Sequence, residues 1–217
     1  MKYIITALTL AFALALPSFA KEKEKKSEIP PPSAQSAPSS QEGMPAEGMD
    51  MEAMMQQYAA LMAPGEEHKE LGKCVSKWTL KIRMMMPGMP PHESSGTSEI
   101  HWILDGHYLQ EDVTGDMMGN PFHGINIIGY DKFRKQYVNC WIDNMSTGIW
   151  TSSGFHDPAT NSTTMMGQMD DPMTGDIGKW SKSIIRMVDD DHFTMEMHDL
   201  VLGANSKVME IEYSRVK

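Results

Sequence analysis

Short stretches of alternating apolar and polar residues, separated by turn-forming residues, fill the chain from Trp78 to its end. Such alternation places every second side chain on one face, as a half-buried β-strand requires. The first two stretches carry their apolar residues at Trp78, Leu80, Ile82 and Met84, and then at Ile100, Trp102 and Leu104. The Asp105-Gly106 dipeptide favours a tight turn into a strand over 107–114. We expect further strands over 122–130, 136–144, 148–156, 162–169, 179–188, 192–200 and 207–215.

This strand spacing indicates the fold class. About ten strands, with no helix between them long enough for a crossover, favour an antiparallel meander. A sheet with this many strands tends to curl, and closing it removes the exposed strand edges. The sequence therefore predicts an all-β protein with an antiparallel up-and-down β-barrel, preceded by one or two short helices.

A helical pattern precedes the strands. Between Met49 and Met62, large apolar residues recur at spacings of three and four, at Met51, Met54, Met55, Tyr58 and Met62. This spacing predicts one amphipathic helix that ends at Pro64. A second short helical segment over 66–75 follows the Pro64-Gly65 break. A methionine stripe suits a helix that packs against a barrel.

The N-terminal region has two distinct compositions. In residues 1–20, Lys2 precedes an apolar run, and small residues stand before a cleavage site after Ala20, which is the pattern of a secretory signal. The run is shorter than the ~20 apolar residues that span a bilayer, so we expect no membrane span after cleavage. Residues 21–46, rich in Pro, Ser, Lys and Glu, predict a disordered tether. The barrel domain with its N-terminal helix then covers 47–217, in a periplasmic or secreted protein.

The charge of the chain limits the classes of partner it can bind, and its cysteine content limits the disulfides it can form. The chain has 29 Asp and Glu against 19 Lys and Arg, a formal charge of −10, so nucleic acids and anionic membranes are poor candidate partners. Cys74 and Cys140 are its two cysteines, and an oxidising compartment permits a disulfide between them. Such a bond would restrict the unfolded chain by about 4 kcal/mol.

The strand-rich region contains several long motifs in one order. They are GTSEIHWILDGHYLQEDVTGDMMGNPFHGINIIGYD, YVNCWIDNMSTGIWTSSGFHD, MDDPMTG, and RMVDDDHFTMEM with VMEIEYSR. From about Pro64 to Arg215 the chain thereby resembles the bacterial family of unknown function DUF1579. The resemblance implies a lipocalin-like, calycin-type barrel that is often exported, with no established activity and no catalytic residues to carry over. The chain departs from such barrels at Ser76-Lys77-Trp78, where a Gly-x-Trp signature is common, and the family usually lacks the two cysteines.

The interior of a barrel is either filled by side chains or shaped into a ligand pocket. Polar and aromatic residues share a face on two predicted strands, Tyr137, Asn139, Trp141 and Asp143 on one and Tyr108, Gln110 and Asp112 on the other. We predict a shared interior space and name its ligand-binding residues as Trp102, Tyr108, Gln110, Tyr137, Asn139, Trp141 and Asp143. Alternation does not decide which face is inside. The opposite assignment, with Leu109, Val113, Val138, Cys140 and Ile142 in the core, stays open.

Methionine is unusually frequent, at 22 of 217 residues. Thioether sulfurs are suitable ligands for Cu(I), although methionine on strands is also an adaptable core filler. The candidate copper ligands are Met44, Met49, Met51, Met54, Met55 and Met62, followed by Met84, Met85, Met86 and Met89.

The remaining chemistry-bearing residues give weaker signals. The eight histidines lack metal-ligand spacing, and no nucleophile motif occurs. Glu111 and Asp143 are a conceivable pair of carboxylates across the barrel, but nothing selects them. We therefore expect no cofactor and no metal site, and favour a non-catalytic protein that binds a small, partly apolar ligand. A methionine-rich periplasmic Cu(I)-binding protein and an uncharacterised barrel enzyme are the alternatives.

Overall fold

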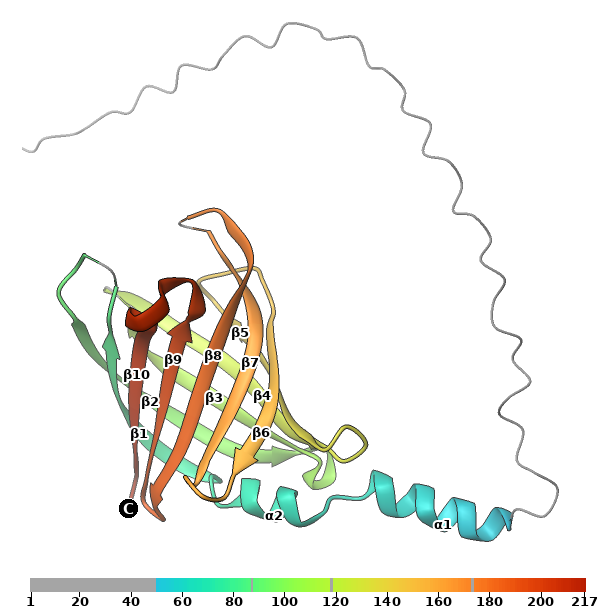
Figure 1. Cartoon of the computed structure of the whole chain (residues 1–217). Coiled ribbons are helices and arrows are strands. Elements are labelled where there is room, and N and C mark those ends of the chain that lie inside the picture. The colour runs from blue at the N-terminus through green and yellow to red at the C-terminus, as the bar shows by residue number, and fades with distance from the viewer. Residues whose placement is uncertain (1–49, 87, 118, 173) are drawn as a thin grey trace, which may run out of the picture. The chain divides into compact units, whose positions relative to one another are not determined.

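The computed structural model describes residues 50–217 except 87, 118 and 173 (Figure 1). The predicted secretory signal and tether lie outside these residues. In the described part, the helices are α1 (Met51–Met62) and α2 (Glu66–Gly72). The strands are β1 (Ser76–Met84), β2 (His92–Ile103), β3 (Tyr108–Met117), β4 (Asn120–Asp131), β5 (Gln136–Asp143), β6 (Trp150–Asp157), β7 (Ser162–Asp171), β8 (Asp176–Asp189), β9 (His192–Asp199) and β10 (Lys207–Arg215).

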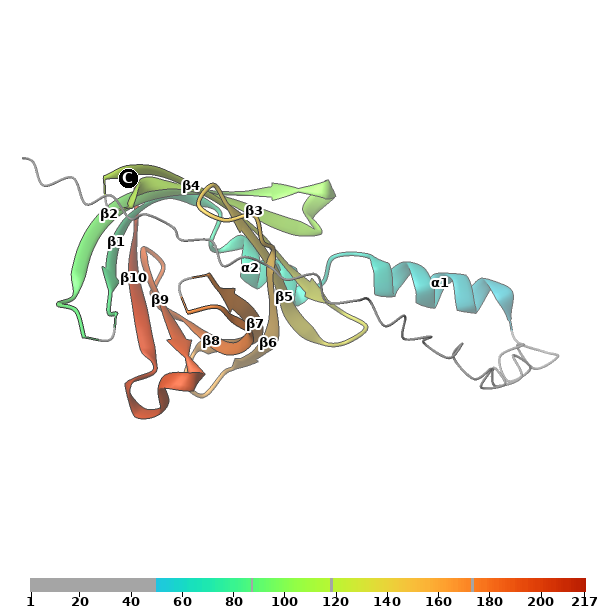
Figure 2. The ribbon, with the colours of Figure 1, turned by 90° about the horizontal axis from the view of Figure 1, so that it is seen from above.

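The ten strands form a closed antiparallel barrel in which consecutive strands are neighbours. β1 completes the ring by pairing with β10, with Trp78 opposite Arg215 and Met84 opposite Met209. Viewed from above, the strands follow one another around a ring (Figure 2). Antiparallel strands joined by short turns pair with their neighbours in sequence. Pairing the first strand with the last then closes the barrel and leaves no unpaired edge. The predicted up-and-down barrel is confirmed.

α2 covers the end of the barrel at which β1 begins (Figure 1). Leu71 packs against the barrel core, and a Cβ atom at Gly72 would lie 3.3 Å from Cζ2 of Trp102. The indole of Trp102 therefore lies directly beneath the C-terminal residue of α2. Since this helix is only seven residues long, it covers the barrel end without crossing the interior.

α1 does not pack as its pattern predicts. None of its residues is buried, and Met51, Met55 and Met62 are each more than half exposed, at 62%, 59% and 54%. Lys132 Nζ donates to the carbonyl oxygens near its C-terminus, those of Ala60 and Ala63, at 2.5 and 2.8 Å. The expectation that the methionine stripe of α1 packs against the barrel is wrong, because α2 already covers the barrel end.

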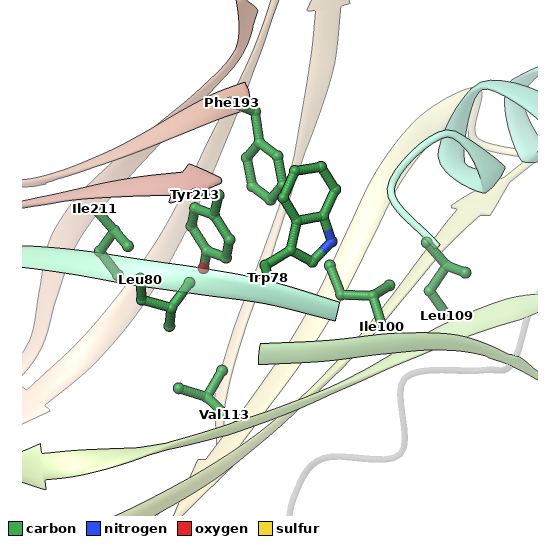
Figure 3. Packing of buried hydrophobic residues seen from close by; sticks show 8 residues of the cluster. All are labelled: Trp78, Leu80, Ile100, Leu109, Val113, Phe193, Ile211 and Tyr213. Carbon is green, nitrogen blue, oxygen red and sulfur yellow. The ribbon is translucent and has the colours of Figure 1, made fainter. Parts of the chain in front are cut away.

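The core is built around Trp78, which is fully buried (Figure 3). Its indole Nε1 donates to the carbonyl oxygen of Cys74 at 2.9 Å, and its ring meets Phe193 edge-on at 4.8 Å between centroids. Phe193 in turn stacks on Tyr213 at 4.0 Å. The guanidinium of Arg215 lies 4.3 Å from the Trp78 ring centroid, a cation–π contact. These contacts join β1 to β9 and β10 where the barrel closes.

Most of the buried hydrophobic side chains lie on one side of the barrel interior. The buried hydrophobic cluster consists of Trp78, Leu80, Ile100, Leu109, Val113, Phe193, Ile211 and Tyr213, all from β1, β2, β3, β9 and β10. The inward-facing buried positions of β6, β7 and β8 are mostly small, namely Ser152, Gly154, Met165, Gly167, Ser181 and Ser183. The wall opposite the cluster therefore leaves interior volume that it does not fill.

We predict that Trp78→Ala lowers the free energy of unfolding by about 3–5 kcal/mol, because it removes a fully buried aromatic side chain and leaves a cavity. Chemical denaturation of the purified chain measures this loss. The matched control is Trp180→Ala on β8, since Trp180 is 52% exposed, and its effect should stay within about 0.5 kcal/mol. Equal losses in the two variants would contradict the assignment of Trp78 as the centre of the core.

Candidate functional site

A cavity of about 1210 Å³ lies inside the barrel beside the hydrophobic cluster. At the end covered by α2 its lining includes Leu71 and Cys74, and at the other end it includes the loop over 144–149. Ser152, Met165 and Ser183 contribute from the small-residue wall. Because small-molecule sites commonly have volumes of ~300–1,000 Å³, this space is large enough for a bound organic molecule.

β5 presents its predicted ligand-binding face to this cavity. Tyr137, Asn139, Trp141 and Asp143 all line it, so the sequence assigned the correct face to this strand. The Trp141 indole occupies the space that a side chain at Gly124 would need, since a Cβ atom there would lie 2.3 Å from the Trp141 ring. Glycine on β4 thereby permits a large aromatic residue on β5 to lie inside the barrel.

Asp143 connects Trp141 to the loop at the open end. The Trp141 Nε1 donates to Asp143 Oδ2 at 2.8 Å. The other carboxylate oxygen accepts from the backbone N–H groups of Met145 and Ser146, at 2.9 and 3.0 Å. One carboxylate therefore orients an indole in the cavity wall and the first residues of the loop that borders it.

The predicted inward face of β3 is wrong. Leu109, Glu111 and Val113 are the buried residues of this strand, whereas Tyr108 is 39% exposed and covers Gly129. Gln110, on the same face as Tyr108, donates to Asp112 at 3.0 and 3.1 Å. The physical reason is that the apolar residues of β3 occupy the other phase of the alternation, so burial of Leu109 and Val113 turns Tyr108 and Gln110 outward.

Trp102 also differs from its expected place. It packs against the hydrophobic cluster beneath α2 and does not contribute to the cavity lining. Of the three aromatic residues expected to share one interior space, only Trp141 lines the cavity, because α2 covers Trp102 and β3 turns Tyr108 outward.

The two cysteines are free thiols rather than a disulfide. Cys74 lines the cavity between α2 and β1, whereas Cys140 alternates with Asn139 and Trp141 and so lies on the other face of β5. The barrel wall therefore separates the two side chains. Burial, with a smaller contribution from the Glu111 charge, raises the pKa of Cys74 to about 11, so the thiol is protonated at neutral pH.

Glu111 is the acceptor at the centre of a buried polar network. Its Oε1 accepts from Ser98 Oγ at 2.9 Å and from the Tyr213 hydroxyl at 3.1 Å, and its Oε2 accepts from Asn126 Nδ2 at 3.3 Å. Burial raises the pKa of Glu111, and the three hydrogen bonds oppose that shift. The carboxylate is thus held by β2, β4 and β10 in the middle of the barrel.

The network continues from Glu111 to the opposite wall. Asn139 Nδ2 donates to Asn126 Oδ1 at 3.2 Å, and Ser152 donates to Asn139 Oδ1 through its hydroxyl and through its backbone N–H. Every donor points toward Glu111, so the chain of hydrogen bonds has one direction from β6 to β3. Sequence reasoning identified Asn139 but not this set as a whole, because its members lie on six different strands.

Two buried polar atoms stand outside this network. Within the described part of the chain, Ser183 Oγ and Trp150 Nε1 are buried and have no hydrogen-bond partner. Both residues line the cavity. Ser183 is 5% exposed, so its hydroxyl is shielded from bulk solvent. Buried polar groups are nearly always hydrogen-bonded, and these two therefore mark a place where a ligand can supply an acceptor.

Methionine is prominent in the same lining. The residues concerned, among those described, are Met84, Met117, Met145, Met165, Met169, Met187, Met195, Met197 and Met209. The β-sheet register places Met84 opposite Met209 and Met209 opposite Met197, on β1, β10 and β9. Of the copper candidates, Met44 and Met49 lie outside the described residues, and Met84 belongs to this row.

A family model described as a protein of unknown function, DUF1579, matches residues 63–215. The chain belongs to the DUF1579 family. No curated protein matches it. The crystal structure of Rv2717c from M. tuberculosis is similar with a TM-score of 0.51 and 10% identity, covering 71% of this chain and 100% of that one. A redesigned β-barrel, b11L5F_LGL, has a TM-score of 0.37 and 9% identity, covering 67% and 94%. The similarity to Rv2717c supports the barrel fold alone.

Two further features of this DUF1579 protein concern metal ions and membranes. Within residues 50–217, apart from 87, 118 and 173, no three His, Cys, Asp or Glu side chains are grouped so that they could hold a metal ion. Among the helices that the structure describes, none combines the length and apolar character needed to cross a membrane.

We predict that Glu111→Gln changes the pH dependence of stability. The raised pKa means that folded Glu111 holds its proton more tightly than the unfolded chain does, so its contribution is complete below pH 4.5 and is lost as pH rises through the folded pKa. The variant does not titrate there. Its free energy of unfolding should therefore improve relative to wild type as pH rises, by at most about 1.4 kcal/mol per pH unit.

Urea denaturation between pH 4 and pH 8 measures this difference. Glu212→Gln is the matched control, because Glu212 is an exposed glutamate on β10. If Glu111→Gln and wild type showed parallel pH profiles, the buried carboxyl would not be the titrating group that the structure indicates.

Proposed function

We propose that this protein is a non-catalytic carrier that holds a small, largely apolar molecule inside its barrel. The observation that carries this proposal is the cavity of about 1210 Å³, whose exposed surface is mostly apolar and comes from methionine, isoleucine and aromatic side chains, alongside polar and acidic residues. The secretory pattern of residues 1–20 supports a place of action outside the cytoplasm.

The arrangement of Glu111 supports binding rather than catalysis. All three of its hydrogen bonds come from protein side chains, those of Ser98, Asn126 and Tyr213, so both carboxylate oxygens already have partners. A general acid or base must reach a proton on the substrate. Held in this way, Glu111 fixes the interior of the barrel and keeps Asn126 and Asn139 in place beside the ligand space.

We predict that the chain binds N-phenyl-1-naphthylamine, a neutral apolar dye whose fluorescence rises in apolar surroundings. Met165→Trp should weaken binding by about tenfold, or 1.4 kcal/mol, because Met165 is 5% exposed and lines the cavity, so the larger side chain occupies ligand space. Fluorescence titration measures both affinities.

Met166→Trp is the matched control, since the neighbouring Met166 is 36% exposed and lies on the other face of β7. This variant should bind the dye as wild type does. Circular dichroism and thermal unfolding establish that both variants fold. If the Met165 and Met166 variants bind the dye equally strongly, the dye binds outside the barrel and the carrier proposal is contradicted.

The methionine row gives a second candidate function, which is the binding of Cu(I). Met84, Met209 and Met197 lie directly opposite one another on three adjacent strands and line the same cavity. Side chains opposite one another in a sheet have Cβ atoms ~5 Å apart, so flexible thioethers from the three positions can converge. Soft sulfur ligands of this kind select Cu(I).

We predict that, if this site operates, the double variant Met197→Leu and Met209→Leu loses about tenfold or more in Cu(I) affinity, since leucine keeps the volume and removes the sulfur. Competition with bathocuproine disulfonate under reducing conditions measures it. The control is Met51→Leu with Met55→Leu on α1. If the wild-type chain does not compete for Cu(I) at micromolar copper, the Cu(I)-binding function is contradicted. If only the α1 control variant loses Cu(I) affinity, the copper site lies on α1 instead of in the barrel.

A further inference from the structure

We propose that the molecule held in the barrel is uncharged and presents a hydrogen-bond acceptor to Ser183 and Trp150, and that the cavity rejects anionic amphiphiles. This inference rests on the proposed carrier function and specifies its ligand class. The ligand has an apolar body and a hydroxyl, ether or carbonyl oxygen. Carboxylates with the same apolar body are excluded.

The two unpartnered groups define the polar part of the ligand. Trp150 Nε1 can only donate a hydrogen bond, and the Ser183 hydroxyl can donate one. In the row of residues across the strands, Ser183 lies between Met197 on β9 and Met165 on β7, whose thioethers are weak acceptors. An oxygen atom from a ligand is therefore the partner that these donors lack, and supplying it removes the cost of leaving them unpaired.

The register places both donors over one stretch of the wall. The Trp150 indole lies over Gly167, since Nε1 is 2.9 Å from where a Cβ atom at Gly167 would stand. Gly167 pairs with Ser181, and the next inward pair is Met165 with Ser183. Ser183 is thus a diagonal neighbour of Gly167, about 7–8 Å away between backbones. One ligand can reach both donors.

The charge of the lining argues against an anion. Among the described residues, the acidic side chains that line the cavity are Glu70, Glu111, Asp116, Asp143, Asp170, Asp189 and Asp190, while Lys73 is the one lysine or arginine there. Lys73 is already paired with Glu70 at 2.5 Å. A carboxylate entering the barrel would therefore meet like charges and, among the described lining residues, no lysine or arginine free to pair with it, which disfavours it. A neutral oxygen carries no such penalty and can accept from the two unpartnered donors.

The test compares two ligands that share one apolar chain. Decanol and decanoate, at pH 7.5, are titrated against the complex of the purified full chain with N-phenyl-1-naphthylamine. Decanol should displace the dye at concentrations about tenfold or more below those that decanoate requires. The dye itself carries no formal charge, so its binding reports the carrier function independently of ligand charge.

A pair of serine variants tests the hydrogen bond. Ser183→Ala should weaken decanol binding by about threefold to tenfold, measured against the variant's own dye affinity, and should not lower the free energy of unfolding, because the hydroxyl has no protein partner to lose. Ser181→Ala is the matched control two residues away on the same face of β8. Ser181 is fully buried, but its hydroxyl donates to the Gly167 carbonyl oxygen at 3.2 Å, so this variant should lose stability and keep decanol affinity.

The outcomes separate the two proposals. If the dye does not bind, the carrier function fails. If the dye binds and decanoate displaces it as well as decanol does, the carrier function stands and the charge selection is overturned. If Ser183→Ala binds decanol as wild type does, or if Ser181→Ala shows the larger loss of decanol affinity, the assignment of Ser183 as the ligand's hydrogen-bond donor is overturned.

Discussion

A closed barrel of ten strands encloses more space than the large side chains clustered on one side of its interior can fill. The width of a barrel grows with strand number, and about eight strands give an interior that side chains just fill. Here the large residues gather on β1, β2, β3, β9 and β10 around Trp78, while the facing wall has Ser152, Gly167 and Ser183 at buried positions. The strand number and this unequal distribution of side-chain size together produce the cavity, and every functional inference depends on it.

The polar interior follows from the same geometry. A polar group that faces the barrel interior must find partners on other strands, and Glu111 does so through Ser98 and Asn126 on the two adjacent strands and through Tyr213 on β10. The partners therefore link β3 to three other strands. Buried networks of this kind are costly when incomplete, which is why the two unpartnered donors on the opposite wall are informative about the ligand.

The strands and their order were predictable, because alternation and turn residues act locally. Which face of each strand points into the barrel depends on the residues that alternate along it. On β3, Leu109, Glu111 and Val113 occupy alternate positions, which indicates that the glutamate faces inward with the two apolar residues. The aromatic character of Tyr108 outweighed that signal. Ser183 and Trp150 could not be identified, since the lack of a partner is a property of the assembled wall. The helical spacing of α1 was correct, but its exposure depends on α2 covering the barrel end.

The topology also imposes an order of events on folding. Nine of the ten strand pairings join consecutive strands and can form as hairpins, with a small loss of chain entropy. The tenth joins β1 to β10, for example Thr79 to Ser214 across 135 positions of sequence. Distant pairings are slow to form, so we expect the closing seam, with the contact between Trp78 and Arg215, to form late. Until that seam forms there is no enclosed space to occupy, and a guest molecule can therefore stabilise only the completed ring.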